Sequence, residues 1–168
     1  MTSPPEAQYQ FEPLSPRHDR TGFSCGVDAL DHYLKTQARQ DMDRDLSSVF
    51  VFTLDRRTIA GFYTLSASSI RANELPHEHA RKLPHLPLPA TLLGRLAVSA
   101  HLQAQGIGYI LLMDALRRSL LGAQGIASWA VIVDTKVGAR AFWTKHGFLS
   151  FDSDRERLFL KMDTIRKL

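Results

Sequence analysis

The chain has 168 residues, of which 44% are hydrophobic and 23% charged, a balance typical of a globular domain that can bury a core. Its 21 lysine and arginine residues outnumber 17 aspartate and glutamate residues, and the formal charge of +4 favours an anionic partner without indicating a dedicated nucleic-acid-binding block. The single cysteine excludes an intramolecular disulfide, and no apolar run at the start indicates a secretory signal or membrane span, so we expect a cytoplasmic protein.

We expect a single domain over residues 1–168, in which residues 1–8 are disordered. Residues 11–14 predict a short edge strand that ends before Pro16. Ser24 then predicts the N-cap of an amphipathic helix. The apolar residues that follow at helical spacing are Val27, Leu30, Leu34 and Ala38.

Two runs rich in β-branched and aromatic residues predict a β-hairpin, residues 48–54 and residues 59–67. The following segment, residues 71–89, contains four prolines and predicts a long surface loop, which we expect to shape the mouth of a substrate site. This loop carries His77, His79 and His85, whose spacing matches no established zinc pattern, so we expect no metal site.

The second half of the chain has regular periodicity. Residues 90–99 predict a strand, and residues 108–121 predict a helix with a leucine-rich face. Residues 129–133 are continuously apolar, which is typical of a central strand buried on both sides.

The end of the chain predicts a short helix at residues 138–146 and a closing strand pair at residues 148–151 and 157–162. The expected fold class is therefore α/β, with a mixed, mostly antiparallel sheet and helices on both faces.

The turn before the leucine-faced helix reads Gln103-Ala104-Gln105-Gly106-Ile107-Gly108. Unpaired backbone N–H groups and the positive end of the helix dipole converge at such a position, which favours an anion. Gly106 and Gly108 carry no side chain that would keep a diphosphate away from the backbone. The alternative is a helix N-terminus that carries two glycines without a ligand.

This turn and the later run Ala141-Phe142-Trp143-Thr144-Lys145-His146-Gly147-Phe148 resemble the GNAT superfamily of N-acetyltransferases. The family's coenzyme A motif is Gln/Arg-x-x-Gly-x-Gly/Ala, and its late helix typically reads Ala-x-x-Phe-Tyr-x-x-x-Gly-Phe. The resemblance implies the GNAT fold from Phe23 onward, with acetyl-CoA as the cofactor. The residues that it assigns to the cofactor are Leu96, Ala97, Val98, Gln103, Ala104, Gln105, Gly106, Ile107, Gly108, Tyr109, Phe142 and Lys145.

A narrower resemblance links the chain to the acetyltransferase toxins of bacterial type II toxin–antitoxin systems. It rests on the proline-rich stretch within residues 71–89 and on four further segments, Phe23-Ser24-Cys25-Gly26, Gly61-Phe62-Tyr63-Thr64-Leu65, Leu93-Gly94-Arg95-Leu96-Ala97-Val98 and Asp114-Ala115. The likeness implies an aminoacyl-tRNA substrate, a ribbon-helix-helix antitoxin as partner and a homodimer. Arg95 and Arg140 are our candidates for contacts with that RNA, with solvated surface charge as the alternative.

One position departs from the family's pattern. The family's tyrosine commonly protonates the departing thiolate, and the residue here is Trp143, whose indole N–H donates a hydrogen bond but does not release its proton near neutral pH. Tyr63 is the candidate replacement acid, although a strand tyrosine more often packs in the core. Trp143 and Tyr63 are thus the residues to examine for catalysis.

The sequence leaves the acceptor open. The chain is expected to be an acetyl-CoA-dependent N-acetyltransferase that acts on the α-amino group of aminoacyl-tRNA and so blocks translation. The alternatives are an ordinary GNAT enzyme that acetylates a small amine or a protein N-terminus, and a catalytically impaired acyl-CoA-binding homologue, which Trp143 motivates.

Overall fold

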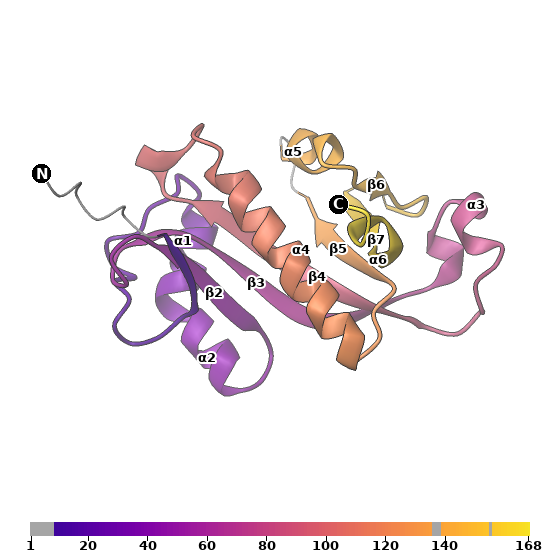
Figure 1. Cartoon of the computed structure of the whole chain (residues 1–168), viewed down its shortest axis with the longest axis horizontal. Coiled ribbons are helices and arrows are strands. Elements are labelled where there is room, and N and C mark those ends of the chain that lie inside the picture. Colours follow the sequence, from indigo (N-terminus) through magenta and orange to yellow (C-terminus); the bar gives the residue numbers. More distant parts are fainter. Residues whose placement is uncertain (1–8, 136–138, 155) are drawn as a thin grey trace, which may run out of the picture. The chain divides into compact units, whose positions relative to one another are not determined.

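The computed structural model describes residues 9–135, 139–154 and 156–168 (Figure 1). The expected disorder of residues 1–8 and the expected helix start at Gly138 lie outside the described residues.

The residues form two units by their internal contacts. The first unit comprises residues 1–65 and 95–115, and the second comprises residues 66–94 and 116–168. The elements that contribute residues to both units are strand β3 (Ile59–Ile70), strand β4 (Leu88–Val98) and helix α4 (Ile107–Gly125). The expectation of a single domain over the whole chain stays a prediction.

The first unit contains the predicted hairpin. Strand β2 (Ser48–Thr53) pairs antiparallel with β3, with Val51 opposite Phe62. Strand β1 (Gln10–Pro13) pairs antiparallel with the other edge of β2 and confirms the predicted first strand within one residue at each end. Val49 and Val51 of β2 are buried with the less buried Phe50 between them, whereas residues 59–64 of β3 are all buried, so this part of β3 is covered on both faces.

The predicted first helix is two helices, α1 (Asp28–Thr36) and α2 (Ala38–Asp43), separated at Gln37. The prediction of Ser24 as the N-cap is wrong, because Val27 occupies that position and makes no side-chain capping bond. Asp31 in the first turn of α1 instead accepts a hydrogen bond from the Cys25 N–H, with 2.9 Å between Oδ1 and N.

The core of the first unit lies between α1 and the strands β2 and β3. Leu34, Val51 and Phe62 are fully buried, and Phe23 meets Phe62 edge to face at 5.6 Å between ring centroids. Burying an aliphatic or aromatic side chain of this size contributes roughly 1.5–3 kcal/mol. The apolar spacing on α1 therefore positions the segment before it, residues 23–27, against the sheet.

The prediction of a long surface loop at residues 71–89 is wrong in part. The segment contains the short 3-10 helix η1 (Ala72–Glu74) and helix α3 (His77–Ala80), and β4 begins at Leu88. Its apolar residues Ala72, Leu75 and Leu88 belong to the core of the second unit. Burial of these side chains stabilises a folded structure in a segment whose prolines predict a loop.

The remaining strands of the second unit are β5 (Ala130–Asp134), β6 (Leu149–Ser150) and β7 (Arg157–Lys161), and its helices are α5 (Arg140–Lys145) and α6 (Met162–Ile165). Strand β5 pairs in parallel with β4 over Ala90–Leu92 and antiparallel with β7. Residues 130–133 are buried, which confirms the predicted inner strand.

The strand order is β1-β2-β3-β4-β5-β7-β6 in a seven-stranded sheet. The pairings β1–β2, β2–β3, β5–β7 and β6–β7 are antiparallel, and β4–β5 is parallel. The expected fold class, a mixed and mostly antiparallel sheet accompanied by helices, is confirmed. No helix within the described ranges is long and apolar enough to cross a membrane.

Candidate functional site

The predicted anion-binding turn lies between the 3-10 helix η2 (Ala100–Leu102) and α4, in the first unit. Residues 103–106 are exposed, whereas Ile107 is buried and fixes the first turn of α4 to the unit. Helix α4 has 19 residues, so several aligned peptide dipoles end at this turn. The turn is therefore open to solvent while the helix behind it is held in place.

The backbone of the turn adopts the conformation that its glycine content predicts. Gly106 has φ +81° and Ala104 has φ +62°, so the backbone enters the left-handed region twice within this turn. In the described part of the chain, no backbone-to-backbone hydrogen bond is donated by residues 104–106. A side chain added at Gly106 would meet nothing within 4 Å, so the space beside this backbone is open to a ligand.

The end of β4 is held close to β3 and α4 by a glycine. A Cβ added at Gly61 would lie 2.8 Å from a Leu111 methyl carbon and 2.9 Å from the Ala97 carbonyl oxygen, both far inside contact distance. The Ser99 N–H also donates to the Ala60 carbonyl at 2.8 Å. Leu96 and Val98 remain half-buried on this strand. The strand that the resemblance assigns to the cofactor is thus fixed beside the turn within the first unit.

The side chain of Gln103 makes contacts that sequence reasoning missed. Its Nε2 donates to the Cys25 carbonyl at 2.8 Å and to the Val98 carbonyl at 3.0 Å. The motif spacing predicted only a backbone role for Gln103, because a bond between residues 78 positions apart leaves no local pattern in a sequence.

Tyr63, the candidate replacement acid, lies in the core of the first unit. Its side chain is fully buried, and its hydroxyl donates to the carboxylate of Asp114 on α4. Phe11 and Phe50 pack against its ring at centroid distances of 6.3 and 5.3 Å. These contacts favour the core role that the sequence also allowed, and the catalytic role of Tyr63 stays a prediction.

Arg95, a predicted substrate contact, packs on an aromatic ring. Its Cζ lies 3.5 Å from the centroid of the Tyr33 ring, a cation–π contact that ties β4 to α1. Burial and a hydrogen bond from the Tyr33 hydroxyl to Asp41 raise the pKa of Tyr33 to about 12, so this phenol stays protonated. Arg95 therefore has a structural partner in the described structure, and its contact with substrate stays a prediction.

The other catalytic candidate, Trp143, lies on α5 in the second unit. Its ring is 8% exposed and meets Phe142 and Phe148 edge to face, at 5.0 and 5.3 Å between centroids. On the same helix, the Arg140 guanidinium donates to the Ser150 hydroxyl. The exposed Lys145 side chain follows. Trp143 thus packs between two aromatic rings, and its indole takes the place of the tyrosine in the family's pattern.

His146 and Cys25 have titration behaviour that fits structural roles. Burial, aided by the neighbouring Lys145 charge, lowers the pKa of His146 and so favours the neutral ring. Burial and the carboxylate of Asp31 raise the pKa of the Cys25 thiol to about 11, so no reactive thiolate forms near neutral pH. No cluster of three or more metal-ligating side chains occurs within residues 9–135, 139–154 and 156–168.

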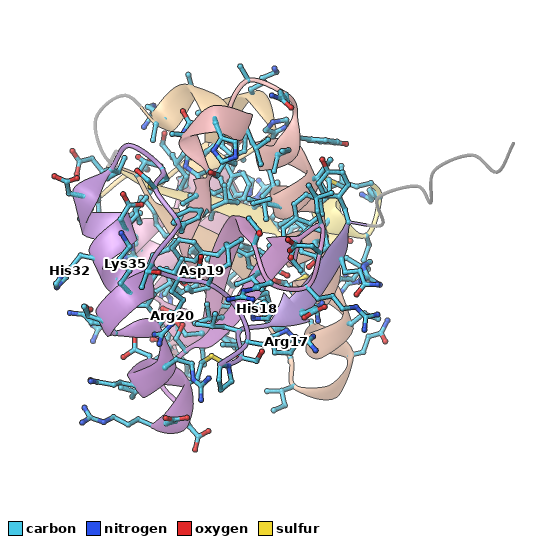
Figure 2. The ribbon with its side chains drawn as sticks, turned by 90° about the vertical axis from the view of Figure 1, so that its left-hand side faces the viewer. Arg17, His18, Asp19, Arg20, His32 and Lys35 are labelled. Carbon is cyan, nitrogen blue, oxygen red and sulfur yellow. The ribbon has the colours of Figure 1, made fainter. Side chains whose placement is uncertain are left out.

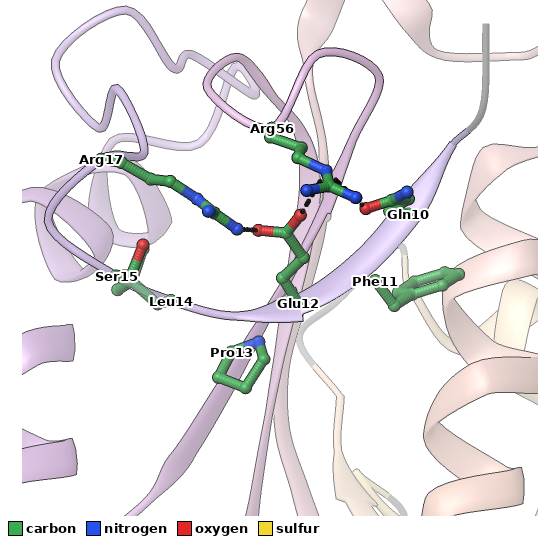
Figure 3. A pocket seen from close by; sticks show the side chains of 8 residues that line it. All are labelled: Gln10, Phe11, Glu12, Pro13, Leu14, Ser15, Arg17 and Arg56. Carbon is green, nitrogen blue, oxygen red and sulfur yellow. Dashed lines mark hydrogen bonds and ion pairs between the residues drawn. The ribbon is translucent and has the colours of Figure 1, made fainter.

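A hollow of about 560 Å³ lies along β1, and none of the predicted site residues lines it. Its carboxylate, Glu12, is bound by the Arg17 guanidinium and lies 3.8 Å from Nε of Arg56 (Figure 3). Glu12 also bonds the buried His18 ring at 2.9 Å. Burial would raise the pKa of Glu12, but the bonds from Arg17 and His18 outweigh it and hold this pKa below its ordinary value. The charges of this hollow are therefore already paired with one another.

Figure 2 labels six polar side chains on one face of the first unit, among them His18 and Asp19. Arg17 and Arg20 come from the segment after β1, and His32 and Lys35 come from α1. Arg20 donates to the Leu34 and Lys35 carbonyls, so it caps the end of α1.

The predicted site residues fall into two sets. The first unit holds the β4 residues from Arg95 to Val98, the turn from Gln103 to Gly108, Tyr109 and Tyr63. The second unit holds the α5 residues Arg140, Phe142, Trp143 and Lys145. The site geometry described here, an exposed turn beside a fixed strand, belongs to the first set.

Comparison with known proteins identifies the family of the chain. Residues 23–148 match the acetyltransferase (GNAT) family. The chain is 32% identical over 179 residues to the probable toxin TacT of Sinorhizobium fredii (strain NBRC 101917 / NGR234), covering 100% of this chain and 99% of that protein. It is 35% identical over 156 residues to a tRNA-acetylating toxin of Mycobacterium tuberculosis (strain ATCC 25618 / H37Rv), covering 92% of this chain and 93% of that protein. A crystal structure of AtaTR bound with acetyl-CoA is similar at TM-score 0.84 and 25% identity, covering 95% of this chain and 96% of that chain. The chain therefore belongs to the acetyltransferase (GNAT) family.

Proposed function

We propose that this protein is an acetyl-CoA-dependent N-acetyltransferase toxin that acetylates the α-amino group of aminoacyl-tRNA and thereby blocks translation. The observation that supports acetyl-CoA as the cofactor is the open turn at residues 103–106, with its left-handed backbone at Ala104 and Gly106. The acceptor is inferred from the similarity to a tRNA-acetylating toxin along nearly the whole chain.

In this proposal the backbone N–H groups from Gln103 to Gly108 hold the diphosphate of the cofactor. Leu96, Ala97 and Val98 pair with the pantetheine amides in the manner of an added strand. Acetyl-CoA supplies the activated acetyl group. The chain's main contribution is to hold the acceptor amine next to it, and proximity of this kind supplies much of the rate enhancement in direct transfer. A backbone N–H near Val98 donates to the carbonyl oxygen as negative charge develops there.

With Trp143 in place of tyrosine, the departing thiolate lacks the phenol that commonly protonates it in the family. An indole N–H does not transfer its proton near neutral pH, so the thiolate would take its proton from water or from the acceptor nitrogen, which becomes positively charged once the neutral amine has attacked. The proposed enzyme is therefore slower than a variant with a phenol at residue 143.

The similarity to acetyltransferase toxins also supports a localisation, an oligomeric state and a partner. We infer a cytoplasmic protein that forms a homodimer and binds a ribbon-helix-helix antitoxin. Arg95 and Arg140 remain the proposed contacts to the acceptor RNA, and Tyr109, Phe142 and Lys145 the proposed further contacts to the cofactor.

The experiment is incubation of the purified protein with radiolabelled acetyl-CoA and total charged tRNA, followed by counting of label in the RNA fraction. The matched control is the same tRNA after mild alkaline deacylation, which removes the α-amino group and keeps the RNA. We expect label in charged tRNA and none in the deacylated control. Label in peptides or small amines, with none in charged tRNA, would replace this acceptor by that of an ordinary GNAT enzyme.

A further inference from the structure

The side-chain amide of Gln103 lies between two backbone carbonyls. Its Nε2 is 2.8 Å from the Cys25 oxygen and 3.0 Å from the Val98 oxygen. Both neighbours are acceptors, so the NH₂ end of the amide must face them, and its two hydrogens satisfy one carbonyl each. One side chain of the turn is thus bonded both to the last residue of β4 and to the segment before α1.

That segment is bonded at three points to its surroundings in the first unit. The Ala100 N–H donates to the Ser24 carbonyl at 2.7 Å, and the Cys25 N–H donates to Asp31 on α1 at 2.9 Å. Gln103 binds the Cys25 carbonyl, which follows these two bonded groups along the chain. A continuous path of hydrogen bonds therefore runs from the turn through Cys25 to α1.

The exposed part of this segment flanks the end of β4. Ser24, Gly26 and Val27 are exposed, and Gly26 has φ +87° with nothing within 4 Å of an added Cβ. The bonds from Ala100 and Gln103 place residues 24–25 directly beside the chain that follows Val98. Because the proposed function puts the acetyl group at the end of β4, an acceptor amine that reaches it passes this segment.

We propose that Gln103 is a positioning residue that fixes the acceptor-side segment, residues 24–27, to the cofactor-binding turn. The inference rests on the proposed acetyl-CoA function. The backbone of the turn holds the diphosphate, while the hydrogen bonds of the Gln103 side chain hold residues 24–27 at a fixed position relative to the turn. A change of this side chain therefore acts on the acceptor and leaves most of the cofactor affinity in place.

The test uses the full chain with Gln103→Met, which keeps the length of the side chain and removes both donors. Amide hydrogen exchange of residues 23–31 should become about tenfold faster, since two neutral hydrogen bonds are lost. The KM for the acceptor should rise about tenfold, and the dissociation constant of acetyl-CoA should stay within about threefold. Gln103→Arg, which restores N–H donors, should recover both exchange and KM. The control Gln40→Met, at an exposed position of α2, should change neither.

Unchanged exchange at residues 23–31 in Gln103→Met, or equal losses of cofactor and acceptor affinity, would overturn the positioning role. If Gln103→Met does not fold, Asp31→Ala releases the other end of the same path and should give the same pattern. The exchange measurement needs no acceptor, so it decides the role of Gln103 even if charged tRNA takes no label. Absence of label in any amine, with exchange behaving as expected, would instead contradict the proposed function alone.

Discussion

The phenol that the family carries at the position of Trp143 can be restored by substitution. Trp143→Tyr introduces a hydroxyl that can donate a proton to the thiolate, and Trp143→Phe introduces a ring of the same size without that hydroxyl. The two variants differ by a single oxygen atom, so their comparison separates general acid catalysis from packing.

The structure sets the magnitude of the packing effect. Trp143 is 8% exposed and meets Phe142 and Phe148 edge to face, so either smaller ring leaves part of the indole volume empty. Large-to-small changes of this kind destabilise by about 1–3 kcal/mol, and we expect nearly the same loss in both variants. The hydroxyl should raise turnover of Trp143→Tyr over Trp143→Phe by about 10²–10⁴-fold, the usual range for general acid help.

The assay is the initial rate of thiol release from acetyl-CoA at saturating acceptor, measured across pH beside thermal unfolding of each variant. Trp143→Tyr should gain a basic limb near pH ~10, where a phenol loses its proton, and Trp143→Phe should lack this limb. Equal turnover in two variants that unfold at the same temperature would refute the account of the missing acid. A faster Trp143→Phe would refute it as well.

Three further changes have expected outcomes. Gly106→Ala should weaken coenzyme A binding about tenfold in calorimetry, because its methyl group enters the ligand's space and the residue has φ +81°. The control Gly122→Ala, in the interior of α4, should stabilise the fold by about 0.5–1 kcal/mol and leave the affinity for coenzyme A unchanged. Equal affinities of the two variants for coenzyme A would count against a binding role of the turn. Tyr63→Phe should lower the free energy of unfolding by about 1.5–3 kcal/mol in denaturant titration, because the Asp114 carboxylate loses a donor, and a large fall in turnover at unchanged stability would show a catalytic role instead. The folded pKa of Glu12 lies below its ordinary value of 4.5, so its contribution to stability is complete above that pH and is lost as the pH falls through the folded pKa. Glu12→Gln should therefore flatten the acid-side decline of the melting temperature, and an unchanged decline would exclude Glu12 as its source.

The elements that the sequence predicted best are those whose burial pattern is local. The hairpin of β2 and β3, the buried strand β5 and the helix α4 all carry periodic or continuous apolar residues, and burial of those residues decides their structure. The turn before α4 was predictable for a related reason, since glycine at residue 106 and its place before a helix are both read from adjacent positions.

The elements that the sequence predicted poorly depend on distant partners. Residues 71–89 look like a loop because of their prolines, yet Ala72 and Leu75 enter a core whose other members are far along the chain. Ser24 looks like an N-cap, but bonds from Ala100 and between Cys25 and Asp31 set the local geometry. The contacts of Gln103 are of this tertiary kind, and no spacing rule points to them.

The most direct measurement of the central claim is a set of calorimetric titrations with coenzyme A, with 3′-dephospho-coenzyme A, which keeps the diphosphate, and with pantetheine, which lacks both the diphosphate and the adenosine 3′-phosphate. If backbone amides around Gly106 hold the diphosphate, both ligands that carry it should bind with a dissociation constant below about 1 mM and pantetheine should bind at least about a hundredfold more weakly. Absence of heat with millimolar coenzyme A, or equal affinity for 3′-dephospho-coenzyme A and pantetheine, would contradict the claim.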